Sequence, residues 1–206
     1  MPLTATRMNL PNQLTVSRFG LTILFMAAVF WRSPLNDTIA LLLFGLASFT
    51  DYLDGKIARS RNLITNFGTL MDPLADKILT CAAFIALVER GQQMSHPTSV
   101  KVEAWMVIII VSRELAITGL RLLAASKHLV LAAERYGKHK TLSQIIAILA
   151  LLILEAYNEW GYWAEVGLKP WLPWFARLAL WLTVGLTLIS GGLYLWRNRR
   201  LYLEDM

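Results

Sequence analysis

Long apolar stretches follow one another along the whole 206-residue chain, separated by short segments that hold many of its charged residues. Each stretch has about 16 to 24 residues, near the length at which a helix crosses roughly 30 Å of hydrocarbon. None has the alternation of polar and apolar positions that a membrane-spanning strand needs. The pattern therefore predicts an all-α polytopic membrane protein. The six predicted transmembrane helices cover residues 14–31, 38–59, 68–88, 104–125, 142–157 and 174–196.

The apolar stretches leave no room for a separate soluble domain. Hydrophobic residues make up 56% of the chain, above the usual share in a soluble domain. We therefore expect residues 1–206 to form one bundle with a short juxtamembrane segment at its N-terminus. The opening residues MPLTATRMNLPNQ lack the apolar stretch and cleavage site of a secretory signal, so the first span is expected to remain.

The net charge of +6 is distributed as in a membrane protein rather than a nucleic-acid-binding protein. The basic residues cluster between apolar stretches instead of along one soluble face. The segments after the second, fourth and sixth spans are richer in Lys and Arg than the opposite loops, which favours a cytoplasmic location for them. Both termini are therefore expected on the cytoplasmic side, and no nucleic-acid partner is expected.

Four carboxylates interrupt this apolar pattern, within the segment DYLDGKIARSRNLITNFGTLMDPLAD at residues 51–76. Ionisable residues near a membrane core are costly, so such a cluster indicates a functional site. Asp51 and Asp54 are three residues apart and Asp72 and Asp76 are four apart, so each pair shares one face of a helix. Helix capping by Asp72 or the end of a span at Asp51 explains one acid at a time, but neither explains two such pairs.

Two pairs of acids on neighbouring helices predict a site for divalent cations. Four carboxylates close together would repel one another unless cations neutralise them. Oxygen ligands suit Mg²⁺ or Mn²⁺, and two such ions about 3.5–4 Å apart can bridge the attacking and leaving oxygens of a phosphoryl transfer. Gly55 and Gly68 beside the acids leave room either for a ligand or for close helix packing. Arg59 fits either a pyrophosphate contact or an interfacial position.

This motif resembles the signature of the CDP-alcohol phosphotransferase family at all eight of its fixed positions. The resemblance extends from about Met8 to the sixth span, which leaves residues 1–7 as an extension without a catalytic role. It implies a six-helix fold, usually dimeric, that transfers a phosphatidyl or related group from a CDP-linked donor to an alcohol and releases CMP. It further implies two divalent cations held by Asp51, Asp54, Asp72 and Asp76, with Asp76 also as general base. The cytidine diphosphate would contact Gly55, Ala58, Arg59 and Gly68.

A second group of residues indicates the acceptor. Taken alone, Arg113 beside Glu114 is either a neutralised structural pair or part of a pocket for an anionic acceptor. Several cations near the acids favour an acceptor that bears a phosphate. The segments VSRE and GKHKT, together with NLPNQLTVSR and TNFGTLMDPLADKIL, resemble the branch of the family that uses CDP-diacylglycerol and sn-glycerol 3-phosphate. By that resemblance the acceptor phosphate would contact Arg113, Arg121 and Lys138, and with less support Lys140 and Thr141, while the donor would contact Asn12 and Thr15. Asn12 is equally well explained as a helix cap.

The sequence pattern also leaves other functions open. A family member with phosphatidylglycerol or inositol phosphate as acceptor would share the motif, and an inactive homologue would retain it. A cation transporter could also use four acids, but transporters typically show inverted repeats and interrupted helices at mid-membrane. The expected protein is a homodimeric enzyme of the bacterial cytoplasmic membrane, with its active site on the cytoplasmic side.

Overall fold

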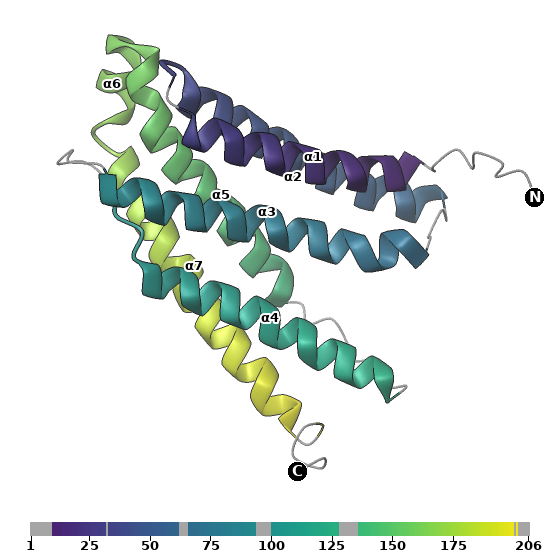
Figure 1. Ribbon diagram of the computed structural model, residues 1–206. Helices are drawn as coiled ribbons and strands as arrows, with labels where there is room; N and C mark the ends of the chain where they lie inside the picture. The colour runs from purple at the N-terminus through teal and green to yellow at the C-terminus, as the bar shows by residue number, and fades with distance from the viewer. Residues whose placement is uncertain are drawn as a thin grey trace, which may run out of the picture. The chain divides into compact units, whose positions relative to one another are not determined.

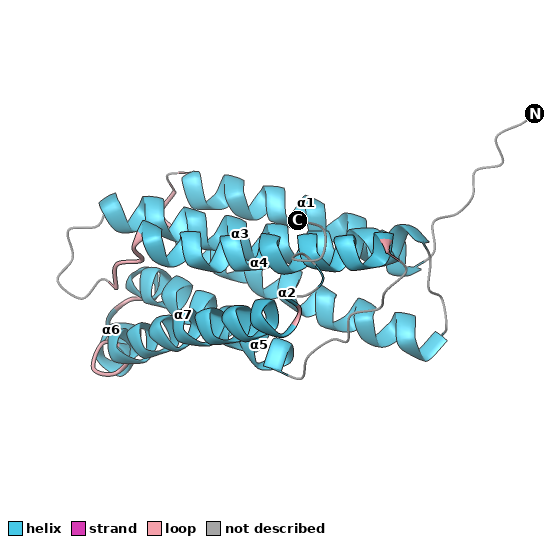
Figure 2. Cartoon of the chain, turned by 90° about the horizontal axis from the view of Figure 1, so that it is seen from below, coloured by secondary structure: helices cyan, strands magenta, loops and turns pink. Residues whose placement is uncertain are grey.

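The computed structural model describes residues 10–31, 33–61, 66–93, 100–127, 136–199 and 201. Side chains are described in these ranges except at residues 10–12, 14–15, 52–61, 66–76, 92–93, 126 and 136–139. The described residues form helices joined by loops and contain no strand (Figures 1 and 2). The predicted all-α class is therefore confirmed.

The long helices follow the predicted spans closely, and two short helices are added to them. The long helices are α1 (Leu10–Phe30), α2 (Asn36–Arg61), α3 (Asn66–Gln93), α4 (Ala104–Ser126), α5 (Tyr136–Ala156) and α7 (Leu172–Arg197). Helix α5 begins at Tyr136 rather than at residue 142, because the polar segment before the apolar stretch is also helical. The connection to α7 contains a 3₁₀ helix, η1 (Tyr157–Trp160), and the short helix α6 (Tyr162–Leu168), neither of which was predicted.

Within the described residues, two helical segments are long and apolar enough to cross a membrane, Lys140–Trp160 and Leu172–Arg197, and a shorter apolar helix covers Val16–Phe30. Helix α4 is also apolar, but Arg113, Glu114 and Arg121 lie within its 23 residues. The six-span bundle therefore stays a prediction.

The chain divides into two compact units, Met1–Ala83 and Phe84–Met206, which are described separately. The division falls within the continuous helix α3, and a single domain over residues 1–206 stays a prediction. In the first unit, α1 and α2 lie side by side (Figure 1). Their core contains the rings of Phe25 and Phe44, whose centroids are 5.8 Å apart, and the buried side chain of Ala47.

In the second unit, α7 has its hydroxyl residues inside and most of its large apolar residues outside. Thr183 and Thr187 are fully buried, whereas Leu178 and Ile189 are about three-fifths exposed. The Thr183 hydroxyl donates a hydrogen bond to the Ser143 carbonyl on α5, at 2.9 Å. A soluble protein shows the reverse distribution, and small or hydroxyl residues between helices are typical of packing in lipid. The outward face of α7 is therefore suited to lipid.

The connection before α7 is rich in exposed aromatic residues. Gly161 joins η1 to α6 with a φ of 82°, a backbone conformation that residues with a Cβ atom rarely adopt. Tyr162 and Trp163 follow it and are 73% and 85% exposed. At the end of α6, a hydrogen bond to the Glu165 carboxylate, assisted by its charge, raises the pKa of Lys169. Exposed tyrosine and tryptophan rings beside charged groups suit the headgroup layer of a membrane.

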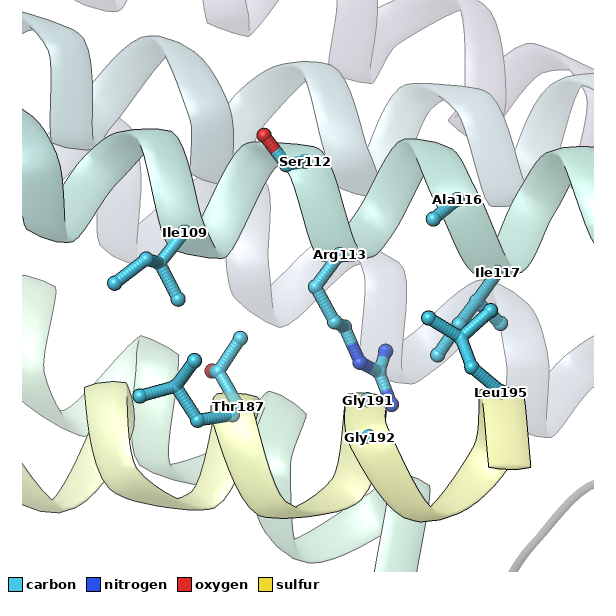
Figure 3. Close-up of a pocket in the computed structure, with 10 residues that line it drawn as sticks. Ile109, Ser112, Arg113, Ala116, Ile117, Thr187, Gly191, Gly192 and Leu195 are labelled. Atoms are coloured by element: carbon cyan, nitrogen blue, oxygen red, sulfur yellow. The ribbon is translucent and has the colours of Figure 1, made fainter. Parts of the chain in front are cut away.

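Helices α4 and α7 approach each other closely at Gly191. The Arg113 side chain extends from α4 toward α7 and passes over this residue (Figure 3). A Cβ atom at Gly191 would lie 2.7 Å from Cγ of Arg113, closer than real contacts allow. A Cβ atom at the next residue, Gly192, would meet nothing within 4 Å. The absence of a side chain at Gly191 therefore determines the path of Arg113.

We expect Gly191→Ala to destabilise the protein and Gly192→Ala to leave its stability unchanged or higher. Overpacking against Arg113 should lower the free energy of unfolding by about 1–3 kcal/mol. The control adds a residue of better helix propensity in open space, which is favourable by up to about 1 kcal/mol. Thermal unfolding of the detergent-solubilised protein, followed by tryptophan fluorescence, provides the comparison. Equal midpoints for the two variants would contradict the described packing.

Candidate functional site

The four aspartates of the acidic motif lie on two consecutive helices, as their spacing requires. Asp51 and Asp54 belong to α2, and Asp72 and Asp76 belong to α3. Figure 1 shows the first part of α3 running back in the direction opposite to α2. Of the four side chains, only that of Asp51 is described. The other predicted site residues whose side chains lie outside the description are Asn12, Thr15, Gly55, Ala58, Arg59, Gly68 and Lys138.

Asp51 is paired with an arginine that was not predicted as a site residue. Nη1 of Arg18 on α1 lies 2.7 Å from Oδ1 of Asp51 on α2. The Arg18 side chain is completely buried, and the Asp51 side chain is 37% exposed. A buried guanidinium needs an opposite charge, so this ion pair fixes the Asp51 carboxylate relative to α1. The sequence signal that could have identified Arg18 is its place inside the first predicted span, four residues after the span begins.

The chemistry of the four acids fits a hard divalent cation. Carboxylate oxygens are the ligands that Mg²⁺ and Mn²⁺ prefer. A carboxylate has two oxygens with several lone pairs, so the contact between Asp51 and Arg18 is compatible with metal coordination. Among the side chains that the structure describes, no group of three or more metal-ligating residues occurs. The cation site therefore stays a prediction that the sequence supports.

The predicted acceptor residues Arg113 and Lys140 meet at one carboxylate. Nζ of Lys140 on α5 donates a hydrogen bond to Oε1 of Glu114 on α4. Nη1 of Arg113 donates to the same oxygen at 3.3 Å, and its Nη2 donates to Oγ of Ser190 on α7, also at 3.3 Å. Glu114, Lys140 and Ser190 are buried. We call Arg113, Glu114, Lys140 and Ser190 the ionic cluster, which links α4, α5 and α7.

The ionic cluster bears on the two explanations that the sequence left open for Arg113. Glu114 pairs with Arg113 and also with Lys140, so a neutralised structural pair is present. Among the described contacts, two cationic side chains nevertheless share this one carboxylate. Such an arrangement is compatible with an anionic ligand at Arg113. Thr141 lies next to Lys140 and is partly exposed.

Arg121 lies on the same side of α4 as Arg113 but contacts a different residue of α7. Its Cζ atom is 5.8 Å from the centroid of the Tyr194 ring, and its Nε is 3.5 Å from the Tyr194 hydroxyl. Arg121 is exposed, whereas Tyr194 is buried. Ser190 and Tyr194 were not predicted as site residues. The polar residues of α7 recur every three or four positions, at 183, 187, 190 and 194, and this helical spacing was the signal that could have identified them.

A pocket of about 360 Å³ lies between α4 and α7 beside the ionic cluster. Its walls are mostly apolar and include Arg113, Thr187, Gly191 and Gly192 (Figure 3). The buried hydroxyl of Thr187 has no hydrogen-bond partner among the described residues. The pocket thus combines an apolar wall with a guanidinium and a hydroxyl, which suits an amphiphilic ligand.

The described features define a class of protein. The part of the chain that the structure describes is helical, with an apolar outward face on α7, two pairs of aspartates on consecutive helices, and an ionic cluster inside the second unit. Comparison with known proteins agrees with this class. The family model for CDP-alcohol phosphatidyltransferase matches residues 8–189. The chain belongs to the CDP-alcohol phosphatidyltransferase family.

Three bacterial relatives carry the same name, CDP-diacylglycerol–glycerol-3-phosphate 3-phosphatidyltransferase. The protein from Bacillus subtilis strain 168 is 41% identical over 202 residues, which cover 92% of this chain and 95% of that protein. The Rickettsia bellii protein is 32% identical, covering 90% of this chain and 93% of its own length. The Haemophilus influenzae protein is 31% identical, covering 90% and 95%. The similarity extends over nearly the whole of each chain.

The unequal burial of Arg18 and Asp51 predicts unequal effects of removing each partner. Asp51→Asn removes the carboxylate that lies 2.7 Å from the buried Arg18 guanidinium and should lower the free energy of unfolding by about 3–5 kcal/mol. Arg18→Met leaves a carboxylate that water can reach, so we expect a loss of no more than about 2 kcal/mol. Thermal unfolding of both variants in one buffer tests this order.

Asp37→Asn serves as the control, because it makes the same change in the first turn of α2, outside the motif. Asp37 accepts a hydrogen bond from Asn36 and its charge favours the start of the helix, so the effect of this change should stay within about 1 kcal/mol, below that of Asp51→Asn. A larger loss for Arg18→Met than for Asp51→Asn would contradict the assigned burial of the pair.

Proposed function

We propose that this protein is a phosphatidylglycerophosphate synthase. It transfers the phosphatidyl group of CDP-diacylglycerol to sn-glycerol 3-phosphate and produces phosphatidylglycerophosphate and CMP. The observation that carries the proposal is the similarity, over nearly full length, to relatives whose names state this donor and acceptor. The complete eight-position motif in residues 51–76 supports retention of the family's chemistry.

The donor site is proposed at the acidic motif. Asp51, Asp54, Asp72 and Asp76 would hold two divalent cations, Mg²⁺ or Mn²⁺, which would neutralise the charge of the pyrophosphate and of the leaving CMP. Gly55, Ala58, Arg59 and Gly68 would receive the cytidine diphosphate, together with Asn12 and Thr15 from α1. The pair of Arg18 with Asp51 would hold one of the ligands in place before the donor binds.

The acceptor phosphate is proposed to contact basic side chains of the second unit. Arg113, Arg121 and Lys138 are the principal candidates, and Lys140 and Thr141 belong to the same group. A guanidinium can donate two parallel hydrogen bonds to a phosphate, which orients the ligand as well as attracting it. Two cationic side chains beside one carboxylate favour a phosphate-bearing acceptor over an uncharged alcohol.

The proposed reaction is a displacement at the phosphorus atom that bears the diacylglycerol. The primary hydroxyl of glycerol 3-phosphate attacks this phosphorus, and its proton passes to Asp76. The bond from phosphorus to the bridging oxygen breaks, and that oxygen leaves as part of CMP. Asp76 is a weak base at neutral pH, so its action requires a raised pKa or an acidified hydroxyl.

The reaction is proposed to occur at the cytoplasmic face of a bacterial cytoplasmic membrane, in a homodimer. The apolar outward face of α7 and the exposed aromatic residues before it support insertion in a bilayer. The basic segments after the second, fourth and sixth spans support an orientation with both termini in the cytoplasm. The donor's acyl chains would then remain in the bilayer, and its cytidine would reach the aqueous side.

Purified protein supplied with CDP-diacylglycerol and radiolabelled glycerol 3-phosphate should form a labelled lipid and release CMP in equal amounts. A chelator should abolish both products, and added Mg²⁺ or Mn²⁺ should restore them, because the four carboxylates need cations to bind the pyrophosphate. Phosphatidylglycerol and inositol phosphate serve as competing acceptors. Release of CMP with one of these but not with glycerol 3-phosphate would reject the proposed acceptor.

Asp76→Asn should lower kcat by about 10²–10⁴-fold, the usual contribution of a general base, with a larger loss where a metal ligand is also removed. The midpoint of thermal unfolding should remain close to that of the unchanged protein, which separates loss of chemistry from loss of fold. Asp37→Asn should retain full activity. Near-normal turnover by Asp76→Asn would remove Asp76 from the mechanism.

A further inference from the structure

Glu114 lies at the centre of the ionic cluster. Its Oε1 atom accepts hydrogen bonds from Nζ of Lys140 and from Nη1 of Arg113. The exposed fractions of the Glu114 and Lys140 side chains are 9% and 3%, so water cannot replace either partner. A buried charge that loses a partner is destabilising, so Lys140 depends on the Glu114 carboxylate, whereas Glu114 would keep Arg113 beside it if Lys140 were removed.

Arg113 has a different place in the ionic cluster. Its side chain lies over Gly191, and its second nitrogen reaches Ser190 on α7. It also lines the pocket between α4 and α7, which Glu114 and Lys140 do not (Figure 3). Arg113 is therefore the cation of the cluster that a ligand entering this pocket would meet.

We infer that Glu114 is a positioning residue for the acceptor, and that Lys140 acts by neutralising Glu114 rather than by touching the acceptor phosphate. Lys140 cancels the carboxylate, so the charge of Arg113 stays effective toward an anion. Without Lys140, Glu114 would cancel Arg113 and draw its guanidinium away from Ser190. This inference rests on the proposed function and reassigns one of its residues.

The alternative is a direct contact between Lys140 and the acceptor phosphate. The two assignments agree for the single variant, because loss of Lys140 weakens acceptor binding in either case. They differ for the double variant Glu114→Gln with Lys140→Met. The double variant restores the charge sum of the unchanged cluster, and it replaces a buried ion pair with neutral side chains of similar size, which proteins often tolerate.

The experiment measures kcat and KM for glycerol 3-phosphate at saturating CDP-diacylglycerol. Lys140→Met should raise KM about 10- to 100-fold, the effect of losing one charge-assisted contact, and change kcat by less than about threefold. The double variant should return KM to within about threefold of the unchanged protein. A KM for the double variant that stays as high as for Lys140→Met would overturn the inference, because it would mean direct contact.

Thermal unfolding gives a second readout that needs no activity. Glu114→Gln should lower the midpoint by roughly 6–20 °C, Lys140→Met should lower it less because Arg113 remains beside Glu114, and the double variant should recover most of the loss seen for Glu114→Gln. Should Lys140→Met not fold, the double variant alone decides, because its KM is compared directly with that of the unchanged protein. A double variant that does not fold would also overturn the inference.

The ion pair between Arg90 and Glu155 provides a matched control in the same unit. It joins α3 to α5 at 2.9 Å, and both side chains are largely buried. Arg90→Met with Glu155→Gln should leave the KM for glycerol 3-phosphate unchanged. Failure of the proposed function would be visible in the unchanged protein, as turnover with a different acceptor only. The same variants would then be compared with that acceptor. A KM for the double variant that stays as high as for Lys140→Met would again overturn the inference.

Discussion

Charged groups among apolar helices need partners of opposite sign, and this requirement determines how the helices within each unit are held together. In the first unit, the buried Arg18 on α1 is paired with Asp51 on α2. In the second, Glu114 on α4 pairs with Lys140 on α5 and with Arg113, which reaches Ser190 on α7. Apart from the pair of neighbours Arg113 and Glu114 on α4, each of these contacts joins residues on different helices, so they specify which helices meet and at what height.

The same ion pairs connect the fold with the proposed chemistry. Asp51 is both the partner of Arg18 and a member of the acidic motif, so packing of α1 against α2 supports a proposed metal ligand. Arg113 is both a member of the ionic cluster and a wall of the pocket between α4 and α7. Gly191 makes room for this arginine, and a methyl group there would collide with it. Substitutions that alter packing at these points should therefore alter ligand binding.

Much of this organisation follows from the sequence. The long apolar stretches predicted six of the described helices, because a chain in lipid must satisfy its backbone hydrogen bonds internally. The fixed spacing of the acidic motif indicated the family, and the match over residues 8–189 confirmed it. The spacing of three and four residues within each aspartate pair needed only a helical backbone to place both acids on one face. These features are local, so neighbouring residues suffice to predict them.

Other features depend on contacts between residues distant in the sequence, and only the tertiary structure decided them. Nothing in the local pattern pairs Arg18 with Asp51, or Lys140 with Glu114, since 33 and 26 residues separate the partners. The sequence alone left two explanations for Arg113, because its charge could be neutralised by Glu114 or directed to a ligand. The structure placed it in contact with Glu114 and beside a pocket. By itself, then, the sequence determined the helices, the acidic motif and the family, while helix packing determined which buried charges compensate one another.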